Sequence, residues 1–431
     1  MVRAVFFVAL LTPLVSEVSR AQEVVAFRST TAVDVRTGEG SPDTTVLVQD
    51  GTIAAIGKDS DVDVPDGARL VDGSGTWLIP GLVEMHTHTT GRDALRRALA
   101  LGVTTVLSIF TGEHPAPDVE DWSNLAEAPS PRVHLVVGRF SPEFPGYLVP
   151  GIELRSPETR TQAQNHLDEL KRQGVRRIKI WQDDAKIWAG PEANMPVLSS
   201  EVMEALIRGA RERQMKVYVH AVRLRFYREA LGFDPDWLIH PLIDARLESS
   251  DLEQLKRQGL GWTSTMTVLL QMGDPKDYAK RVLSDPYLVA TLGSDTKNRL
   301  VADAEANEFA SQKLWAAVTQ NLRQYVERIA ENTRLAHEGG IVLSVGSDSQ
   351  AGVGTHIRDG ASCRGRSRTS YDSQSCNFGR SYGAGRLAPS GDGRGGKGRG
   401  LGDSWFESPH RCPSFPGRRM DHEGWSALVQ S

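Results

Sequence analysis

Two histidines, His86 and His88, stand one residue apart at the end of the apolar run 77–83. If this run is a β-strand, the two-residue period of a strand places both imidazoles on the same face, at its end. Two neutral nitrogen donors on one face make half of a metal site. Two histidines flanking a threonine could equally be solvent-exposed, so a metal site requires further ligands elsewhere in the chain.

Polar residues follow several later apolar runs in the same way: Lys179, His220, His240 and Asp348. Each has a structural explanation when taken alone. A single buried histidine is often a hydrogen-bonded core residue, and Asp348 could be the N-cap of the next helix. Taken together with the histidine pair, they would supply donors from several strands to a single site.

Lys179 lies between Ile178 and Ile180, in a strand expected to be covered on both faces. Lysine is almost never fully buried without a partner, unless its amine reaches solvent at the end of the sheet. A buried amine with a depressed pKa could react with carbon dioxide and form a carbamate. Four histidines, a carbamate and one aspartate could hold two borderline divalent ions such as Zn²⁺. The remaining histidines outside this pattern are expected to be structural: His114, His134, His166 and His337.

The segment from residue 79 to 356 alternates between predicted strands and helices. The strands are expected at 102–107, 132–137, 175–180, 216–220, 237–240, 260–265 and 341–348, and the helices at 92–101, 159–173, 200–213 and within 285–338. This alternation predicts βα units and a parallel sheet. About eight repeats favour an α/β fold of the (β/α)₈ TIM-like barrel type, with its active site at the C-terminal ends of the strands. A doubly wound open sheet is the alternative, but no glycine-rich phosphate loop follows the first strand.

Residues 22–78 are expected to form a small β-domain of the sandwich type, built mainly from this N-terminal segment. They contain short β-rich stretches, and Gln49-Asp50-Gly51 is a hairpin signal. Residues 1–21 are typical of a signal peptide, with Arg3 before an apolar core and small residues near Ala21. The apolar core is too short for a comfortable membrane span. The sequence therefore predicts a secreted or periplasmic protein with no stable membrane span after cleavage.

The composition excludes some classes of protein. The chain has 431 residues, enough for one large domain and a smaller one, and its net charge of −4 gives no reason to expect polyanion binding. All three cysteines, Cys363, Cys376 and Cys412, lie near the C-terminus, so neither a disulfide framework nor a cysteine metal cluster is expected.

At its strand-end residues the chain resembles the amidohydrolase superfamily, and most of all the imidazolonepropionase-like and prolidase-like members. The resemblance covers residues 24–356 and is carried by these motifs: Pro80-Gly81-Leu82-Val83-Glu84-Met85-His86-Thr87-His88, Gly102-Val103-Thr104-Thr105-Val106, Ile178-Lys179-Ile180, Val219-His220-Ala221, Ile239-His240 and Gly346-Ser347-Asp348. Glu84 departs from the pattern, in which aspartate is usual, but this position is not a metal ligand.

The resemblance implies a binuclear metallohydrolase. It assigns His86, His88, carboxylated Lys179 and Asp348 to one metal ion, and Lys179, His220 and His240 to the other. A metal-bridged hydroxide would attack the carbonyl carbon of an amide, dipeptide or cyclic amide, and the C–N bond would break as Asp348, which takes the proton, returns it to the leaving nitrogen. The alternatives are a lactonase or phosphoesterase with the same site, or an inactive truncated product. The partner is expected to be a small molecule or dipeptide; homo-oligomerisation stays open.

Residues 357–431 differ from the rest of the chain because Gly, Arg and Ser replace the aliphatic periodicity. At face value this tail would be disordered and could pass for a nucleic-acid-binding arm. We favour a shifted reading frame that begins near residues 356–358, and expect no nucleic-acid partner. When the nucleotides that encode three successive stretches are read one base later, they can encode sequences that resemble the C-terminus of the superfamily. The three stretches are 365–371, 390–398 and 398–411. The missing segment would supply the last barrel helix and closing strands of the β-domain.

Overall fold

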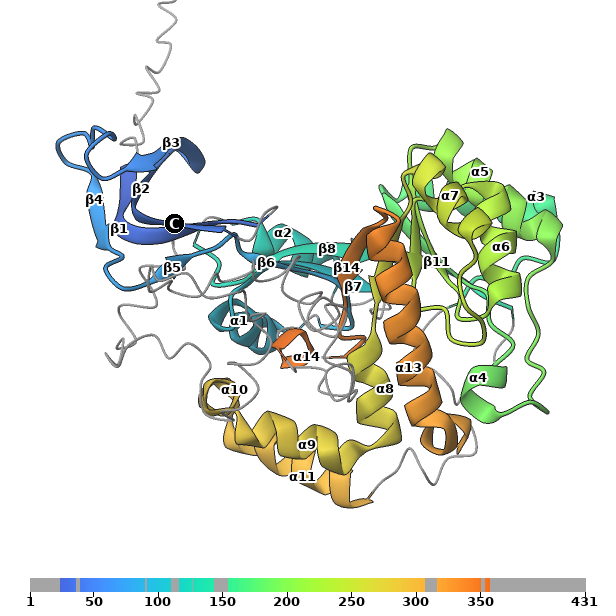
Figure 1. The fold of residues 1–431 in the computed structure, drawn as a ribbon. Coiled ribbons are helices and arrows are strands. Elements are labelled where there is room, and N and C mark those ends of the chain that lie inside the picture. The colour runs from blue at the N-terminus through green and yellow to red at the C-terminus, as the bar shows by residue number, and fades with distance from the viewer. Residues whose placement is uncertain are drawn as a thin grey trace, which may run out of the picture. The chain divides into compact units, whose positions relative to one another are not determined.

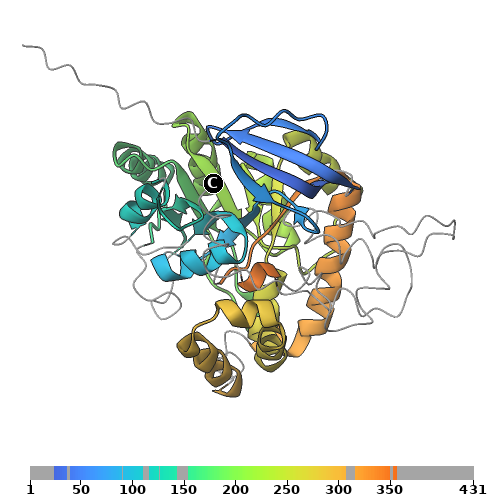
Figure 2. The ribbon, with the colours of Figure 1, turned by 90° about the vertical axis from the view of Figure 1, so that its left-hand side faces the viewer.

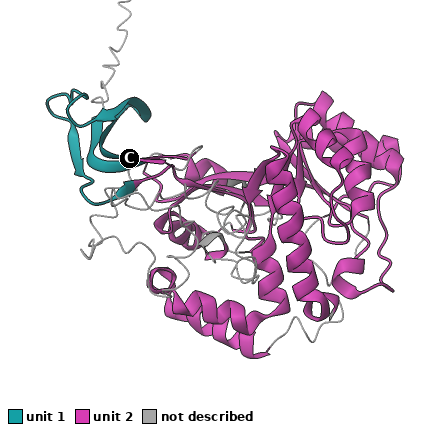
Figure 3. Ribbon diagram, viewed as in Figure 1, with its two compact units in different colours: residues 1–32, 41–77 teal, residues 33–40, 78–431 magenta. Residues whose placement is uncertain are grey.

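A computed structural model gives the fold of the chain (Figure 1). The structure describes residues 24–35, 39–89, 91–109, 116–125, 127–142, 154–306, 316–349 and 353–356. The predicted signal peptide and the predicted out-of-frame tail lie outside these residues. The chain divides into two compact units, one of residues 1–32 and 41–77 and the other of residues 33–40 and 78–431 (Figure 3).

The smaller unit is organised around a five-stranded sheet. Its strands are β1 (Val24–Asp34), β2 (Glu39–Gln49), β3 (Thr52–Lys58), β4 (Arg69–Asp72) and β5 (Trp77–Leu78). They are ordered β3-β2-β1-β4, with β5 also paired to β1. β2 and β3 form the predicted antiparallel hairpin, and both turn residues, Asp50 and Gly51, have positive φ angles, as a tight hairpin turn requires.

This sheet leaves large apolar side chains exposed as well as burying others. Val25, Ala26 and Val46 are buried. The exposed fractions of Ile53, Ile56 and Leu70 are 64%, 63% and 61%. Burying one such side chain contributes roughly 1.5–3 kcal/mol. The outer strands β3 and β4 therefore carry apolar surface that this unit does not use.

The larger unit is a TIM-like barrel, as predicted. Its described residues contain nine parallel strands: β6 (Leu82–Thr87), β7 (Val103–Ile109), β8 (Arg132–Val136), β9 (Gly138–Phe140), β10 (Arg177–Trp181), β11 (Lys216–His220), β12 (Trp237–Ile239), β13 (Gly261–Ser264) and β14 (Val342–Val345). The order is β8-β7-β6-β14-β13-β12-β11-β10-β9. The two outermost strands of this order are separated only by Val137, so one stretch of chain supplies both ends and the barrel is nearly closed. The sequence predicted this stretch, 132–137, as a single strand.

The helices of the barrel unit are α1 (Arg92–Ala100), α2 (Ala116–Ser123), α3 (Arg160–Arg172), α4 (Lys186–Ala189), α5 (Ser200–Glu212), α6 (Leu224–Phe233), α7 (Ser249–Gln258), α8 (Met266–Gly273), α9 (Pro275–Ser284), α10 (Pro286–Thr291), α11 (Ser294–Ala306), α13 (Ala316–Glu338) and α14 (Val353–His356). The region 285–338, predicted as helical, contains α10, α11 and α13, and Leu292 and Gly293 separate α10 from α11. The long helix α13 contacts β14, α4 and α8, and both views show it outside the strands (Figures 1 and 2).

Local sequence explains where these helices begin and which face they bury. The Thr159 hydroxyl accepts a hydrogen bond from the Gln162 backbone N–H, and the Gln162 side chain accepts one from the Thr159 backbone, which forms a capping box at the start of α3. Ala163, Leu167 and Leu170 follow at helical spacing, and all three are buried. Together with one face of α5, they form the main core against the barrel strands. Among the described residues, no helix combines the length and the apolar character needed to cross a membrane.

Candidate metal centre

The six predicted site residues lie at or just beyond the C-terminal ends of barrel strands. They are His86 in β6, His88 after it, Lys179 in β10, His220 at the end of β11, His240 after β12 and Asp348 after β14. Parallel strands present these ends on one side of a barrel, where catalytic residues of this fold are found. Four of the six, His86, Lys179, His220 and His240, have exposed fractions of 3% or less.

Asp348 lies between His86, in the first barrel strand, and His88, just after it. Its Oδ1 is 2.7 Å from His86 Nε2 and 2.8 Å from His88 Nε2. The His88 side chain is 36% exposed and that of Asp348 is 17% exposed, so this group faces solvent on one side. The donors come from β6 and β14, which are neighbours in the sheet. The first and last strands of the barrel therefore meet at this carboxylate.

His240 adds another imidazole to this group. Its ring centroid is 4.8 Å from that of His86, and its Nδ1 is 3.7 Å from Asp348 Oδ2. One potential ligand atom each from His86, His240 and Asp348 lies within 4.8 Å of the others. Ligands of a tetrahedral zinc ion are roughly 3.4 Å apart. These three donors therefore lie close to the spacing that a metal ion needs.

His220 extends the cluster from the side of β11. Its ring centroid is 4.2 Å from that of His240, and its ring stacks on Trp181 at 3.9 Å with an interplanar angle of 12°. Its Nε2 is 3.0 Å from Asp183 Oδ2. Three of the predicted histidines, His86, His240 and His220, thus form a continuous series of ring contacts.

Lys179 is buried at the same end of the barrel, with 1% of its surface exposed. Burial lowers the pKa of its amine to about 8, assisted by the positive charge of Arg139 and opposed by Asp348. Lys179 in turn helps to lower the pKa values of the three buried imidazoles of His86, His220 and His240. The positive charge of Lys179 therefore disfavours protonation of each of these imidazoles.

The protonation states of the cluster suit metal ligation. Burial lowers the pKa of His86 to about 3, and burial also lowers the pKa values of His220 and His240. Burial alone would raise the pKa of Asp348, but the neighbouring imidazoles of His86 and His240 hold it well below its usual range. At neutral pH the imidazoles are therefore neutral and the carboxylate is ionised, which are the forms that bind metals.

The backbone is strained at two of these residues. Asp348 has a φ of 54° and His240 a φ of 74°, in the left-handed region that costs a non-glycine residue of order 1–3 kcal/mol. The turn carrying Asp348 is tied to β6, because Asp348 N donates to His86 O at 2.9 Å and His88 N to Ser349 O at 3.1 Å. A Cβ on Gly346 would lie 2.5 Å from His86 Cβ, so this close approach requires glycine.

Glu84 is buried two residues before His86 and does not belong to the histidine cluster. Its Oε1 accepts a hydrogen bond from the Ser347 backbone N–H at 3.0 Å and another from the Ser347 hydroxyl. Ser347 directly precedes Asp348. Glu84 therefore supports the turn that presents the carboxylate.

The histidines predicted to be structural have other surroundings. His134 lies 3.0 Å from Arg177 and 3.9 Å from Glu120, and His166 is on α3 beside Phe140. His337 is in the last turn of α13. His114 lies outside the described residues.

Two residues close to the site were missed from the sequence. Asp183 contacts His220, and Thr265 Oγ1 lies 2.8 Å from His240 Nδ1. The available signal for Asp183 was a pair of carboxylates, Asp183 and Asp184, shortly after the strand that carries Lys179. Thr265 gave no sequence signal of its own, because its contact depends on the register between β12 and β13.

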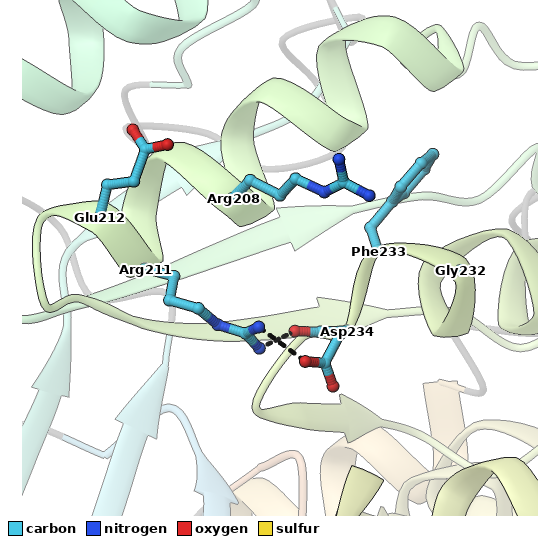
Figure 4. A pocket seen from close by; sticks show the side chains of 6 residues that line it. All are labelled: Arg208, Arg211, Glu212, Gly232, Phe233 and Asp234. Atoms are coloured by element: carbon cyan, nitrogen blue, oxygen red, sulfur yellow. Dashed lines mark hydrogen bonds and ion pairs between the residues drawn. The ribbon is translucent and has the colours of Figure 1, made fainter.

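A surface pocket of about 430 Å³ lies elsewhere, lined by Arg208, Arg211, Glu212, Gly232, Phe233 and Asp234 (Figure 4). These residues lie at the ends of α5 and α6, where the chain leads into the N-terminal ends of β11 and β12. Arg211 donates to the Asp234 carboxylate at 2.6 Å, and Arg208 pairs with Glu204 at 2.7 Å. Both arginines are thus paired with carboxylates. The pocket lies at the opposite end of these strands from the histidine cluster.

The residues of the cluster fit a divalent metal ion. The Nδ1 atoms of His86 and His220 are buried and have no hydrogen-bond partner among the described residues. A buried imidazole nitrogen without a proton or a partner loses hydration, and coordination to a metal would compensate for this loss. Nitrogen donors together with a carboxylate suit zinc and related borderline ions.

Comparison with known proteins gives local sequence matches and a broader structural likeness. No protein-family model matches the chain. The chain is 35% identical to the enamidase of Eubacterium barkeri over 80 residues, which is 16% of this chain and 21% of the enamidase. It is 38% identical to the dihydroorotase of Mycobacterium tuberculosis over 81 residues, 17% of this chain and 18% of the dihydroorotase. The matches thus span about a fifth of the length of these curated relatives.

Solved structures share the fold over most of the chain. A candidate prolidase from Bifidobacterium longum has a TM-score of 0.61 at 17% identity, with 84% of each chain covered. An Xaa-Pro dipeptidase has a TM-score of 0.57 at 13% identity, with 84% of this chain and 87% of that chain covered. At these identities the likeness establishes the barrel fold alone. Together with the local sequence matches and the strand-end motifs, this fold supports the similarity of the chain to the amidohydrolase superfamily.

Proposed function

We propose that this protein is a metal-dependent hydrolase that cleaves a C–N bond in an amide, a dipeptide or a cyclic amide. The observation that carries the proposal is the convergence of His86, His240 and Asp348 donors within 4.8 Å at the C-terminal end of the barrel strands. The chain matches an enamidase and a dihydroorotase in sequence, and this favours the class over a lactonase or phosphoesterase.

The residues would divide between two divalent ions, most simply Zn²⁺. His86, His88 and Asp348 would hold one ion, His220 and His240 the other, and a carbamate on Lys179 would bridge them. The low pKa of the Lys179 amine, about 8, supports carbamate formation because a neutral amine is the nucleophile in that reaction. When bound, the ions would lower the pKa of a water molecule and polarise the substrate carbonyl.

Asp348 would move the proton. Its carboxylate is held ionised by the neighbouring imidazoles and is 17% exposed, so it can reach a water molecule at the mouth. It would accept the proton of the attacking water and return it to the leaving nitrogen. We further propose that residues 1–21 direct the protein to a secreted or periplasmic location.

Metal analysis and an activity panel test the proposal. The full chain and a frame-corrected version would be assayed with acyl-proline dipeptides, hydantoins and dihydroorotate, and in parallel with lactones and phosphotriesters. About two equivalents of metal and turnover of an amide are expected. Turnover of lactones or phosphotriesters alone would contradict the C–N assignment, and near-zero metal would support the inactive-product alternative.

Asp348→Asn is the most direct variant. It should abolish turnover while leaving the metal content nearly intact, because the amide oxygen can still face the metal but cannot take a proton. Asp277→Asn is a matched control, since Asp277 pairs with Arg281 on α9, 2.6 Å away, and contacts none of the six site residues. Full activity in Asp348→Asn would refute the proposed proton transfer.

A further inference from the structure

Asp183 is a buried carboxylate outside the six residues predicted from the sequence. It is 1% exposed and lies two residues after the end of β10. Its Oδ2 lies 3.0 Å from His220 Nε2 and also accepts a hydrogen bond from Trp188 Nε1. Its Oδ1 accepts a hydrogen bond from the Ala185 backbone N–H at 2.8 Å. Both carboxylate oxygens are therefore committed to contacts within the protein.

His220 has different surroundings at its two ring nitrogens. Nε2 faces the Asp183 carboxylate, whereas Nδ1 is buried and has no hydrogen-bond partner among the described residues. A carboxylate can only accept a hydrogen bond, so a neutral His220 must carry its proton on Nε2 to make this contact. That tautomer leaves the lone pair on Nδ1.

The orientation of Asp183 is itself held by packing. Trp188, which donates to Asp183, lies in a buried cluster with Val222, Ile243, Leu269, Val318 and Ile329, among other residues. Ala185, the second donor, has a φ of 62° and is the N-cap residue that precedes the short helix α4. On the other side, the Trp181 ring stacks on His220 and restricts its rotation. The segment 181–188 thus limits both the tautomer and the rotation of this imidazole.

We propose that Asp183 is a positioning residue that holds His220 in the Nε2–H tautomer, so that Nδ1 is the atom offered to a metal ion. The inference rests on the proposed function, because it assigns His220 a ligand's role. Carboxylates that accept the second N–H of a ligating imidazole fix its orientation and raise its basicity, and losing one typically costs about 10- to 100-fold in metal affinity.

The first test measures metal affinity of the full chain. Asp183→Asn removes the charge and keeps the shape, and it should weaken binding of the more loosely held Zn²⁺ equivalent about 10- to 100-fold in a chelator competition. Asp184→Asn is the matched control: Asp184 is equally buried on the same segment, but it pairs with Arg223 and Arg225 rather than a histidine. Equal losses in both variants, or no loss in Asp183→Asn, would overturn the inference.

The second test does not depend on metal binding. Long-range ¹H–¹⁵N correlation spectra of the metal-free protein with labelled histidine report each tautomer, and His220→Gln assigns the resonance. The wild type should show the Nε2–H form of His220, and Asp183→Asn should shift it to a mixture. An Nδ1–H tautomer in the wild type would overturn the inference. If the wild type bound no metal but kept the Nε2–H form, the proposed function would fail while the positioning contact stood.

Discussion

Glu84 and Ser347 are joined by two hydrogen bonds to a single oxygen, although 263 residues separate them in the sequence. Glu84→Ala would leave the backbone N–H and the hydroxyl of Ser347 buried without an acceptor, which should cost about 2 kcal/mol or more. Glu84→Gln keeps the carbonyl oxygen and should cost less. Urea unfolding of the metal-free protein measures both values. A coupling energy below roughly 0.5 kcal/mol in the cycle with Ser347→Ala would contradict this account.

Lys179 should take up carbon dioxide in a pH-dependent manner. With a pKa of about 8, the neutral fraction of its amine should rise about fivefold between pH 7 and pH 8. A ¹³C resonance obtained with labelled bicarbonate should therefore grow over this interval in the metal-free protein. Lys179→Met should lack the resonance and bind less metal. The same signal in both proteins would exclude Lys179 as the carbamate site.

Acid should destabilise the metal-free protein below pH 6.5. The pKa of His86 is about 3 in the fold against an ordinary value of 6.5, so between these values the unfolded chain binds a proton that the folded chain does not. Lowering the pH therefore favours unfolding, by about 2 kcal/mol at pH 5 from this residue. The lowered pKa of Asp348 acts in the same direction, as its carboxylate is protonated more easily in the unfolded chain.

The slope of unfolding free energy against pH measures this effect. Glutamine does not titrate, so the His86→Gln variant should show a shallower slope, reduced by the contribution of about one bound proton. An unchanged slope between pH 6.5 and pH 5 in this variant would contradict the assignment.

Metal removal should lower the thermal stability. A ligand at 100 times its Kd stabilises the folded state by about 2.7 kcal/mol per site. The chelated protein should therefore melt at a lower temperature, and zinc should restore the loss. The His86→Gln and His240→Gln variants should show a smaller response to zinc, whereas His134→Gln, with a side chain paired elsewhere, should respond like the wild type. A chelator effect of equal size in all four proteins would argue against this centre.

The exposed side chains of the small unit lead to a prediction about solubility. Ile53, Ile56 and Leu70 are each more than 60% exposed on β3 and β4, and exposed apolar edge strands favour aggregation. If a shifted reading frame has replaced closing strands of this unit, a frame-corrected gene should yield more soluble protein than the present chain. In the present chain, Ile53→Thr with Ile56→Thr should increase solubility, as measured by sedimentation of lysates. The interpretation would be wrong if neither change had any effect.

The sequence was sufficient for the barrel because its strands and helices alternate with clear periodicity, and the position of each polar residue after a strand was visible. The order of the strands explains why Asp348 reaches His86, since β14 and β6 are neighbours in the sheet. The contacts of Asp183 and Thr265 were not predictable in this way. The contact of Asp183 depends on the left-handed backbone conformation of Ala185, and that of Thr265 depends on the register between β12 and β13. Residue types alone do not encode either feature.

The hydrogen bond from Thr87 Oγ1 to Ser349 O closes a loop of 262 residues. Joining the ends of a flexible loop of that length costs about 5 kcal/mol of chain entropy. Because this entropy must be lost before the contact becomes favourable, pairings of such long sequence separation form slowly. A ribosome must therefore have synthesised the chain beyond Ser349 before the nascent protein could bring Asp348 to His86 and His88.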